Sequence, residues 1–369
     1  MLRKGTFILM KTKIQDMTSG SPGRLIILFA IPLMLGNICQ QLYTMVDTMV
    51  VGQIAGVEAL AALGAVDFLM WVVTGISTGL TQGFSIQLSQ YYGAKDFENL
   101  RKSLAHSYRL TAFIAAGVLI LSQSFASLVL TGLHTPSNII GMSLLYLRII
   151  FCGIPATAAY NMFASALRAM GNSKTPLTAM IIASVLNVSL DLLFVTGFGW
   201  GVAGAAIATV IAQSFSAVYC FLILRRIDIV HLTKADFMPA SGMNARLMKL
   251  GIPVVFQNII IGVGGLVVQY VINGYGFLFV AGFTATNKLY GLLEMAAISY
   301  GYAIVTYVGQ NLGAGKIDRI RKGVRSSMLL SLLTSMIISA VMFLFGKNIL
   351  KSAFGMRKRT LFEKGIRTR

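Results

Sequence analysis

Acidic residues are scarce in this chain. Its 369 residues include 12 Asp and Glu against 31 Lys and Arg, which gives a formal net charge of +19. Charged residues of both signs make up only 12%, whereas 56% are hydrophobic, and the mean hydropathy is +0.75. A soluble globular domain carries about 25% charged residues, so this composition excludes that class. It predicts an all-α polytopic membrane protein.

Lys and Arg are absent from four long stretches, residues 25–94, 110–147, 175–224 and 250–287. They cluster in the segments between these stretches, and every second connection is basic. This placement follows the positive-inside rule and argues against a nucleic-acid surface. We therefore expect a multi-pass protein of the cell membrane, embedded in the lipid bilayer, with a cytoplasmic N-terminus and no nucleic-acid partner.

Cysteines and the motifs of soluble enzymes are also rare. Cys39, Cys152 and Cys220 stand alone in apolar runs, with no CxxC and no His at ligand spacing, so we interpret them as core thiols. The chain has no Walker loop, no HExxH and no nucleophile motif. Its one GxGxxG, at residues 199–204, lacks a βαβ context and is better explained by close helix packing. We expect no enzymatic activity and no cofactor.

About nine membrane spans are predicted from windows of ~20 apolar residues. They cover residues 25–48, 58–90, 104–132, 139–164, 176–197, 202–224, 249–272, 281–310 and 325–347. The apolar run before the first span is too short for a secretory signal, and translation could begin at Met1 or Met10.

The sequence repeats itself with an offset of about 220 residues. AIPLML at Ala30 matches GIPVVF at Gly251, and QYYGAKDFENLRKS at Gln90 matches QNLGAGKIDRIRKG at Gln310. Both copies carry the same basic loop, so the two repeats have the same orientation in the membrane. Parallel repeats of this kind place a binding site at their interface, near the bilayer midplane.

This repeat predicts two lobes. We expect a cytoplasmic segment at 1–24, an N-lobe of six spans at 25–224, a cytoplasmic linker at 225–248, a partial C-lobe of three spans at 249–355 and a basic tail at 356–369. The second repeat is thus incomplete, and its basic tail falls on the side that the charge rule disfavours. A truncated or frameshifted product, a natural short form and a misread gene model all explain this. We expect a monomer.

Polar side chains recur at helical spacing along the first span. They are Asn37, Gln40, Gln41, Thr44 and Asp47. An ionisable group within a span is costly and normally faces an interior cavity. Such amides also bond neighbouring helices, but five aligned polar groups favour a cavity-lining face. We predict that this face lines a substrate cavity.

A second carboxylate, Asp191, lies within the fifth predicted span, where Asn187 shares its helical face. On the sixth span Thr209 shares a face with Gln213 and Ser216. Two carboxylates with amide and hydroxyl oxygens suit either a proton or Na+, because a hard cation prefers oxygen ligands and a buried acid binds its proton tightly. Both ions remain candidates at Asp47 and Asp191.

Several separated segments resemble, in order, the multidrug and toxin extrusion (MATE) family of antiporters. They are GNICQQLYTMVDTMVVGQIAGVEALAALG, FASALRAMGNSKTP, LNVSLDLLFV and the doubled IP openings, within residues 16–355. The resemblance implies two six-helix lobes that export amphipathic cations, driven by inward flow of protons or Na+. It further implies that Asp47, Asn187, Asp191 and Thr209 form a cation site, with Asn161 as a looser match.

Further candidates lie in the C-lobe. Gln257, Asn258 and Glu294 are candidates for substrate contact, although a neutral Glu294 bridging two helices is an equal explanation. The repeat offset also matches Asp67 with Lys288, which indicates either a gate of opposite charges or a coincidence.

The leading hypothesis is therefore an exporter of small amphipathic organic cations in exchange for protons or Na+. A flippase for lipid-linked saccharides, from a related branch of the superfamily, needs cationic groups in its cavity, whereas the polar faces here are acidic and rich in amides. A non-transporting fragment that associates with other membrane proteins is a further alternative. An integral membrane enzyme would need a clustered His/Asp or Cys/His set.

Overall fold

The computed structural model describes residues 14–354, apart from the side chains of residues 281, 285, 286, 288–290, 292, 293, 296, 342 and 345–354. Every regular element in this part is a helix, which confirms the all-α prediction. The helices are α1 (Pro22–Ile54), α2 (Val57–Gly93), α3 (Phe97–Gly132), α4 (Ile140–Cys152), α5 (Ile154–Ala169), α6 (Lys174–Asp191), η1 (Leu192–Gly197), α7 (Gly201–Leu224), η2 (Asp228–Val230), η3 (Lys234–Phe237), α8 (Met243–Asn273), α9 (Phe277–Gly313) and α10 (Ile317–Phe354). Residues 1–13 and the predicted tail at 356–369 lie outside this part.

Within the described residues, seven helices are long and apolar enough to cross a bilayer: α1, α2, α3, α6 with η1, α7, α8 and α10. The pair α4 and α5 forms an eighth candidate, bent by 48°. The sequence predicted one span at 139–164, but Pro155 near the start of α5 has no N–H to donate and interrupts the helix. α9 is a further helix of 37 residues. The protein is a polytopic all-α membrane protein.

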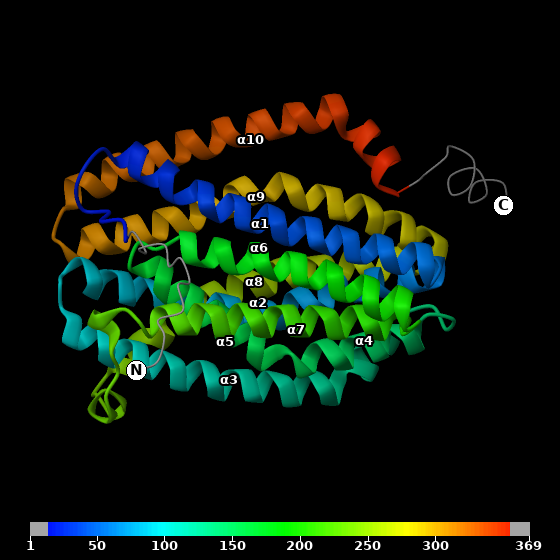
Figure 1. Ribbon diagram of the computed structural model, residues 1–369, viewed down its shortest axis with the longest axis horizontal. Coiled ribbons are helices and arrows are strands. Elements are labelled where there is room, and N and C mark those ends of the chain that lie inside the picture. The colour runs from blue at the N-terminus through cyan, green and yellow to red at the C-terminus, as the bar shows by residue number, and fades with distance from the viewer. Residues whose placement is uncertain (1–13, 355–369) are drawn as a thin grey trace, which may run out of the picture.

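The helices run side by side in one bundle, with α10 along one edge and α3 along the opposite edge (Figure 1). One end of the bundle gathers the N-terminal segment, the turns α2–α3 and α9–α10, and the α7–α8 linker. We call it the basic end, because these connections carry the Lys and Arg clusters of the sequence. The clusters meet there because successive spans reverse direction.

The two predicted repeats meet in a reciprocal arrangement. α2 packs against α8 and α9, while α9 packs against α1 and α2. At the basic end a Cβ on Gly93 would collide with the backbone oxygen of Gln310, and a Cβ on Gly313 with that of Gln90. Matching positions that exchange contacts in this way are what a two-fold relation between copies produces. Glycine at both positions is what allows the two backbones to approach.

The α7–α8 linker is folded onto the start of α3. Asp236 in η3 lies 3.7 Å from the Arg101 guanidinium. The buried His106 ring contacts the Asn244 Oδ1 at 2.7 Å through Nδ1 and the Met238 carbonyl at 3.0 Å through Nε2. The linker thus fixes the beginning of α8 against α3.

The cysteines occupy three different environments. Cys220 is buried, Cys39 is half-buried and Cys152 is exposed, so the prediction of core thiols is wrong for Cys152. Cys152 is the last residue of α4, immediately before the bend, and its Sγ accepts a hydrogen bond from Gln123 Nε2 at 3.3 Å.

Candidate functional site

Two carboxylates are buried among the helices of the N-terminal repeat. Asp47 on α1 is 3% exposed and Asp191 at the end of α6 is 0% exposed. They lie close enough for their charges to interact. α1 and α6 pack against each other, which brings together two acids that are far apart in the sequence.

Asn187 and Thr209 join this cluster as the sequence predicted. Asn187 lies one turn before Asp191 on α6, and its Nδ2 donates to the Thr209 Oγ1 of α7 at 3.4 Å. Within the described residues, neither carboxylate oxygen of Asp191 has a hydrogen-bond partner, and neither does the Oδ1 of Asn187. Buried polar atoms without partners are rare and costly, and these three oxygens can act as acceptors or ligands.

The helix changes its geometry immediately after Asp191. The next six residues, Leu192–Gly197, form the π-helix η1. π-helical turns are uncommon in proteins and often mark functional sites. The sequence predicts one regular span at 176–197. The only signal of this change in the sequence is the series Gly197, Gly199 and Gly201, which also permits the chain to turn into α7.

Two residues of the cluster, Tyr43 and Tyr146, were not singled out from the sequence. Tyr43 lies one turn before Asp47 on α1, is 7% exposed and accepts a hydrogen bond from Gln213 Nε2 at 3.2 Å. Tyr146 on α4 is also buried, and it is close enough to Asp47 for electrostatic interaction. The i, i+4 spacing of Tyr43 and Asp47 was a signal that could have identified Tyr43.

Asn161 bonds to α2, which carries neither of the two buried carboxylates. Its Nδ2 donates to the Thr78 Oγ1 of α2 at 3.1 Å. Thr78 in turn donates to the Thr74 carbonyl of its own helix at 3.1 Å. Most hydroxyls on α2 bond backward in this way, as is usual for hydroxyls in apolar helices.

The predicted substrate residues of α1 have two kinds of partner: some contact α9, and others bond within α1. Asn37 Nδ2 donates to the Ser299 Oγ of α9 at 3.1 Å, and Gln41 lies against Gly291 of α9. These two residues are therefore at the boundary between the repeats. Thr44 donates to the carbonyl of the half-buried Gln40 at 2.8 Å, within the helix.

The candidates in the C-terminal repeat are more dispersed. Asn258 of α8 donates to the Gly75 carbonyl of α2 at 3.0 Å, whereas the neighbouring Gln257 is exposed on another face. Glu294 on α9 is half-buried, as is Asp67 on α2. The side chain of Lys288, the predicted gate partner of Asp67, lies outside the described part of the structure.

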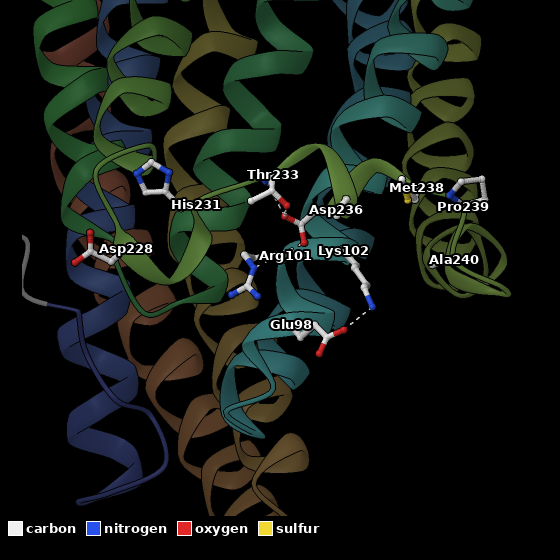
Figure 2. A pocket seen from close by; sticks show the side chains of 11 residues that line it. Glu98, Arg101, Lys102, Asp228, His231, Thr233, Asp236, Met238, Pro239 and Ala240 are labelled. Carbon is white, nitrogen blue, oxygen red and sulfur yellow. Dashed lines mark hydrogen bonds and ion pairs between the residues drawn. The ribbon is translucent and has the colours of Figure 1, made fainter.

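A separate pocket of about 650 Å³ lies at the basic end, between the linker and the start of α3 (Figure 2). Its charged groups include Arg101, which faces Asp236, and Lys102, whose Nζ lies 2.6 Å from the Glu98 carboxylate. The Arg101–Asp236 pair joins α3 to the linker, whereas Lys102 and Glu98 pair within α3. This pocket therefore contains acids that have basic partners.

The carboxylate cluster offers oxygen ligands. Asp47, Asp191 and Asn187 supply carboxylate and carbonyl oxygens and Thr209 a hydroxyl, a set that suits a proton or a hard cation such as Na+. In the part of the chain that the structure describes, no three His, Cys, Asp or Glu side chains gather as a metal cluster.

A bundle of apolar helices with two-fold related repeats and buried acids defines a polytopic membrane transporter. The MatE family model matches residues 32–193 and 253–361, and the chain belongs to this family. It is 32% identical to the probable multidrug resistance protein YpnP of Bacillus subtilis over 308 residues, which cover 84% of this chain and 69% of that protein.

Solved structures agree on the fold. A MOP superfamily transporter from Pyrococcus furiosus, described as having a binding pocket of reverse polarity that suggests a different function, superposes with a TM-score of 0.84 at 22% identity, over 94% of this chain and 77% of that one. An outward-facing multidrug resistance MATE family transporter gives a TM-score of 0.83 at 22% identity, over 96% and 79%.

Proposed function

We propose that this chain is a secondary active antiporter that exports small amphipathic organic cations in exchange for protons or Na+. The observation that carries the proposal is Asp191, a fully buried carboxylate with no hydrogen bond to either oxygen within the described residues and a second acid, Asp47, beside it. The relatives described as multidrug resistance proteins support the substrate class. In this role the chain has no catalytic activity and needs no cofactor beyond the coupling ion.

The electrostatics of the cluster explain why it would bind a cation. A buried carboxylate without partners is unstable as an anion, and two adjacent carboxylates also repel each other. A proton or a Na+ ion relieves both penalties. The N-lobe would then bind the ion from the side of higher concentration and release it on the other side. A gradient of one pH unit supplies ~1.4 kcal/mol for each proton moved.

The boundary between the repeats is the proposed place for the organic substrate. Asn37 and Gln41 of α1 face α9 there, and Asn258 of α8 faces α2. Parallel repeats commonly bind substrate at such an interface, near the bilayer midplane. We further propose that Asp67 and Lys288 act as a gate. Gly64 and Thr284 contact each other, and the two residues follow them by three and four positions on the adjoining helices α2 and α9, which supports this proposal.

Replacing Asp191 tests the coupling role. In vesicles containing this chain, Asp191→Asn should abolish dye efflux driven by an imposed pH or Na+ gradient, because an amide takes up no proton in this range and binds Na+ weakly. Asp228→Asn, which changes an exposed acid on the linker, is the matched control and should export normally.

The alternative is that Asp191 is a structural residue. An amide keeps the shape and one acceptor oxygen of the carboxylate, so a structural Asp191 predicts nearly normal efflux from the Asn variant. Efflux above about half the parental rate, with equal amounts of folded protein, would overturn the coupling role.

A further inference from the structure

Residues 15–20, which we call the N-terminal strap, cross the basic end from one repeat to the other. On the side of the first repeat, the backbone N–H of Gln15 donates to the Gly171 carbonyl at 3.1 Å. The contact is close enough that a Cβ on Gly171 would collide with the Gln15 carbonyl. Gly171 lies in the turn between α5 and α6, so this end of the strap is bound to the N-lobe.

Met17 inserts into the C-terminal repeat. Its backbone N–H donates to the Gln310 Oε1 at 3.0 Å, and its carbonyl accepts from the Asn311 Nδ2 at 2.9 Å. The Met17 side chain is 0% exposed and belongs to a core cluster with Tyr300 and Tyr307 of α9. Gln310 and Asn311 are themselves fully buried. Their hydrogen bonds with the strap backbone therefore satisfy side-chain polar atoms that are buried away from solvent.

The strap also contacts the α9–α10 turn and the first turn of α10. Lys316 Nζ donates to the Thr18 carbonyl at 2.8 Å, and Arg319 Nη1 donates to the Gly20 carbonyl at 2.8 Å. The chain then enters α1 at Pro22. The strap is therefore joined covalently to the N-lobe, while many of its hydrogen bonds go to α9 and α10.

We propose that the strap is a latch that stabilises the closed arrangement of the two lobes at the basic end. The inference rests on the proposed transport function, in which the lobes part alternately at the two membrane surfaces. Parting at the basic end separates α1 from α9 and α10, so the bonds of Met17, Thr18 and Gly20 must break. It also exposes Gln310, whose Nε2 donates to the Ala169 carbonyl of α5 at 2.8 Å.

Two variants remove the latch in different ways. Met17→Ala removes the buried anchor, and Arg319→Gln removes the donor to Gly20. Met180→Ala, at a residue of α6 that is 3% exposed, is a matched loss of a buried methionine away from the strap. All are made in a background in which the three native cysteines are serine.

Spin labels at Glu98→Cys and Asp318→Cys, exposed matching positions in the first turns of α3 and α10, report the separation of the lobes at the basic end. We expect both latch variants to increase the population of a longer distance about tenfold, because each loses a contact that exists only while the lobes are closed at this end. Met180→Ala should leave the distribution unchanged.

Reaction of a cysteine at Ser89 with an impermeant maleimide gives a second measurement, because Ser89 is fully buried against Gly309 and becomes accessible only when the lobes part. Parental distances and labelling rates in both latch variants would overturn the proposal. Neither measurement requires substrate or ion. A latch effect accompanied by normal efflux from Asp191→Asn would therefore overturn the coupling role alone.

Discussion

At the scale of single residues, hydroxyl groups and carboxyl groups within the helices differ in their hydrogen bonding. Thr44, Thr74 and Ser184 donate to carbonyls of their own helices, which satisfies them in an apolar environment at little cost. Asp191 has no such option, because a carboxylate can only accept. Burial within range of Asp47 therefore disfavours its charged form, and this penalty is the basis of the proposed coupling role.

The acid of the strap, Asp16, lies outside the spans and predicts a pH dependence. Burial alone would raise the pKa of Asp16, but the backbone N–H and hydroxyl of Thr18, the hydroxyl of Ser19 and the charge of Lys316 outweigh it, and the pKa lies below the usual 3.8. A carboxyl with a lowered folded pKa stabilises the fold above its unfolded pKa, and this contribution is lost as the pH falls through the folded pKa.

Asp16→Asn should accordingly lower the melting temperature at neutral pH, and the difference from the parent should shrink below about pH 4. Thermal unfolding in detergent across this range measures it. A difference that stays constant down to the acid limit would show that the charge of Asp16 contributes nothing.

At the scale of elements, α2 and α9 determine how closely the lobes approach. Gly93 and Gly313 each face the backbone of the opposite helix, and Gly83 faces Gly251 of α8 in the same manner. Without side chains at these positions the helices pack backbone to backbone, which is how membrane helices gain contact where water provides no hydrophobic driving force.

Gly93→Leu tests this packing. The new side chain must displace the backbone of α9, so we expect destabilisation of about 1–3 kcal/mol, the usual cost of overpacking. Gly117→Leu is the control, because a Cβ on this glycine of α3 meets nothing within 4 Å. Detergent melting curves compare the two, and an equal effect of both would show that the approach of α2 and α9 is not tight.

At the scale of the whole molecule, the fold gathers the connections that are rich in Lys and Arg at one end of the bundle. The strap, the linker and the α2–α3 and α9–α10 turns all lie at the basic end (Figure 1). The positive-inside rule then predicts that this end faces the cytoplasm.

Cysteines at Lys234 in the linker and at Ser137 in the α3–α4 loop test this orientation, since both residues are exposed. In intact cells an impermeant maleimide should label Ser137→Cys and spare Lys234→Cys, and inside-out vesicles should reverse the result. Labelling of Lys234→Cys in intact cells would place the basic end outside.

The sequence by itself determined the class of protein, the approximate spans, the repeat and the residues that meet in the carboxylate cluster. These follow from hydropathy, charge placement and the rarity of acids such as Asp47 and Asp191 in spans, all of which are local properties. Helical spacing also put Asn187 on the face of Asp191, and the bond to Thr209 agrees with that prediction.

Only the tertiary structure decided which groups these side chains contact and how far each is exposed. The 48° size of the bend at Pro155, the π-helix after Asp191 and the exposure of Cys152 were not predicted from the sequence and became visible only in the structure. The strap is the clearest case. Its residues are unremarkable in composition, and the partners of Met17 are 293 and 294 positions away. No local pattern encodes that contact, because the fold alone brings Met17 beside Gln310 and Asn311.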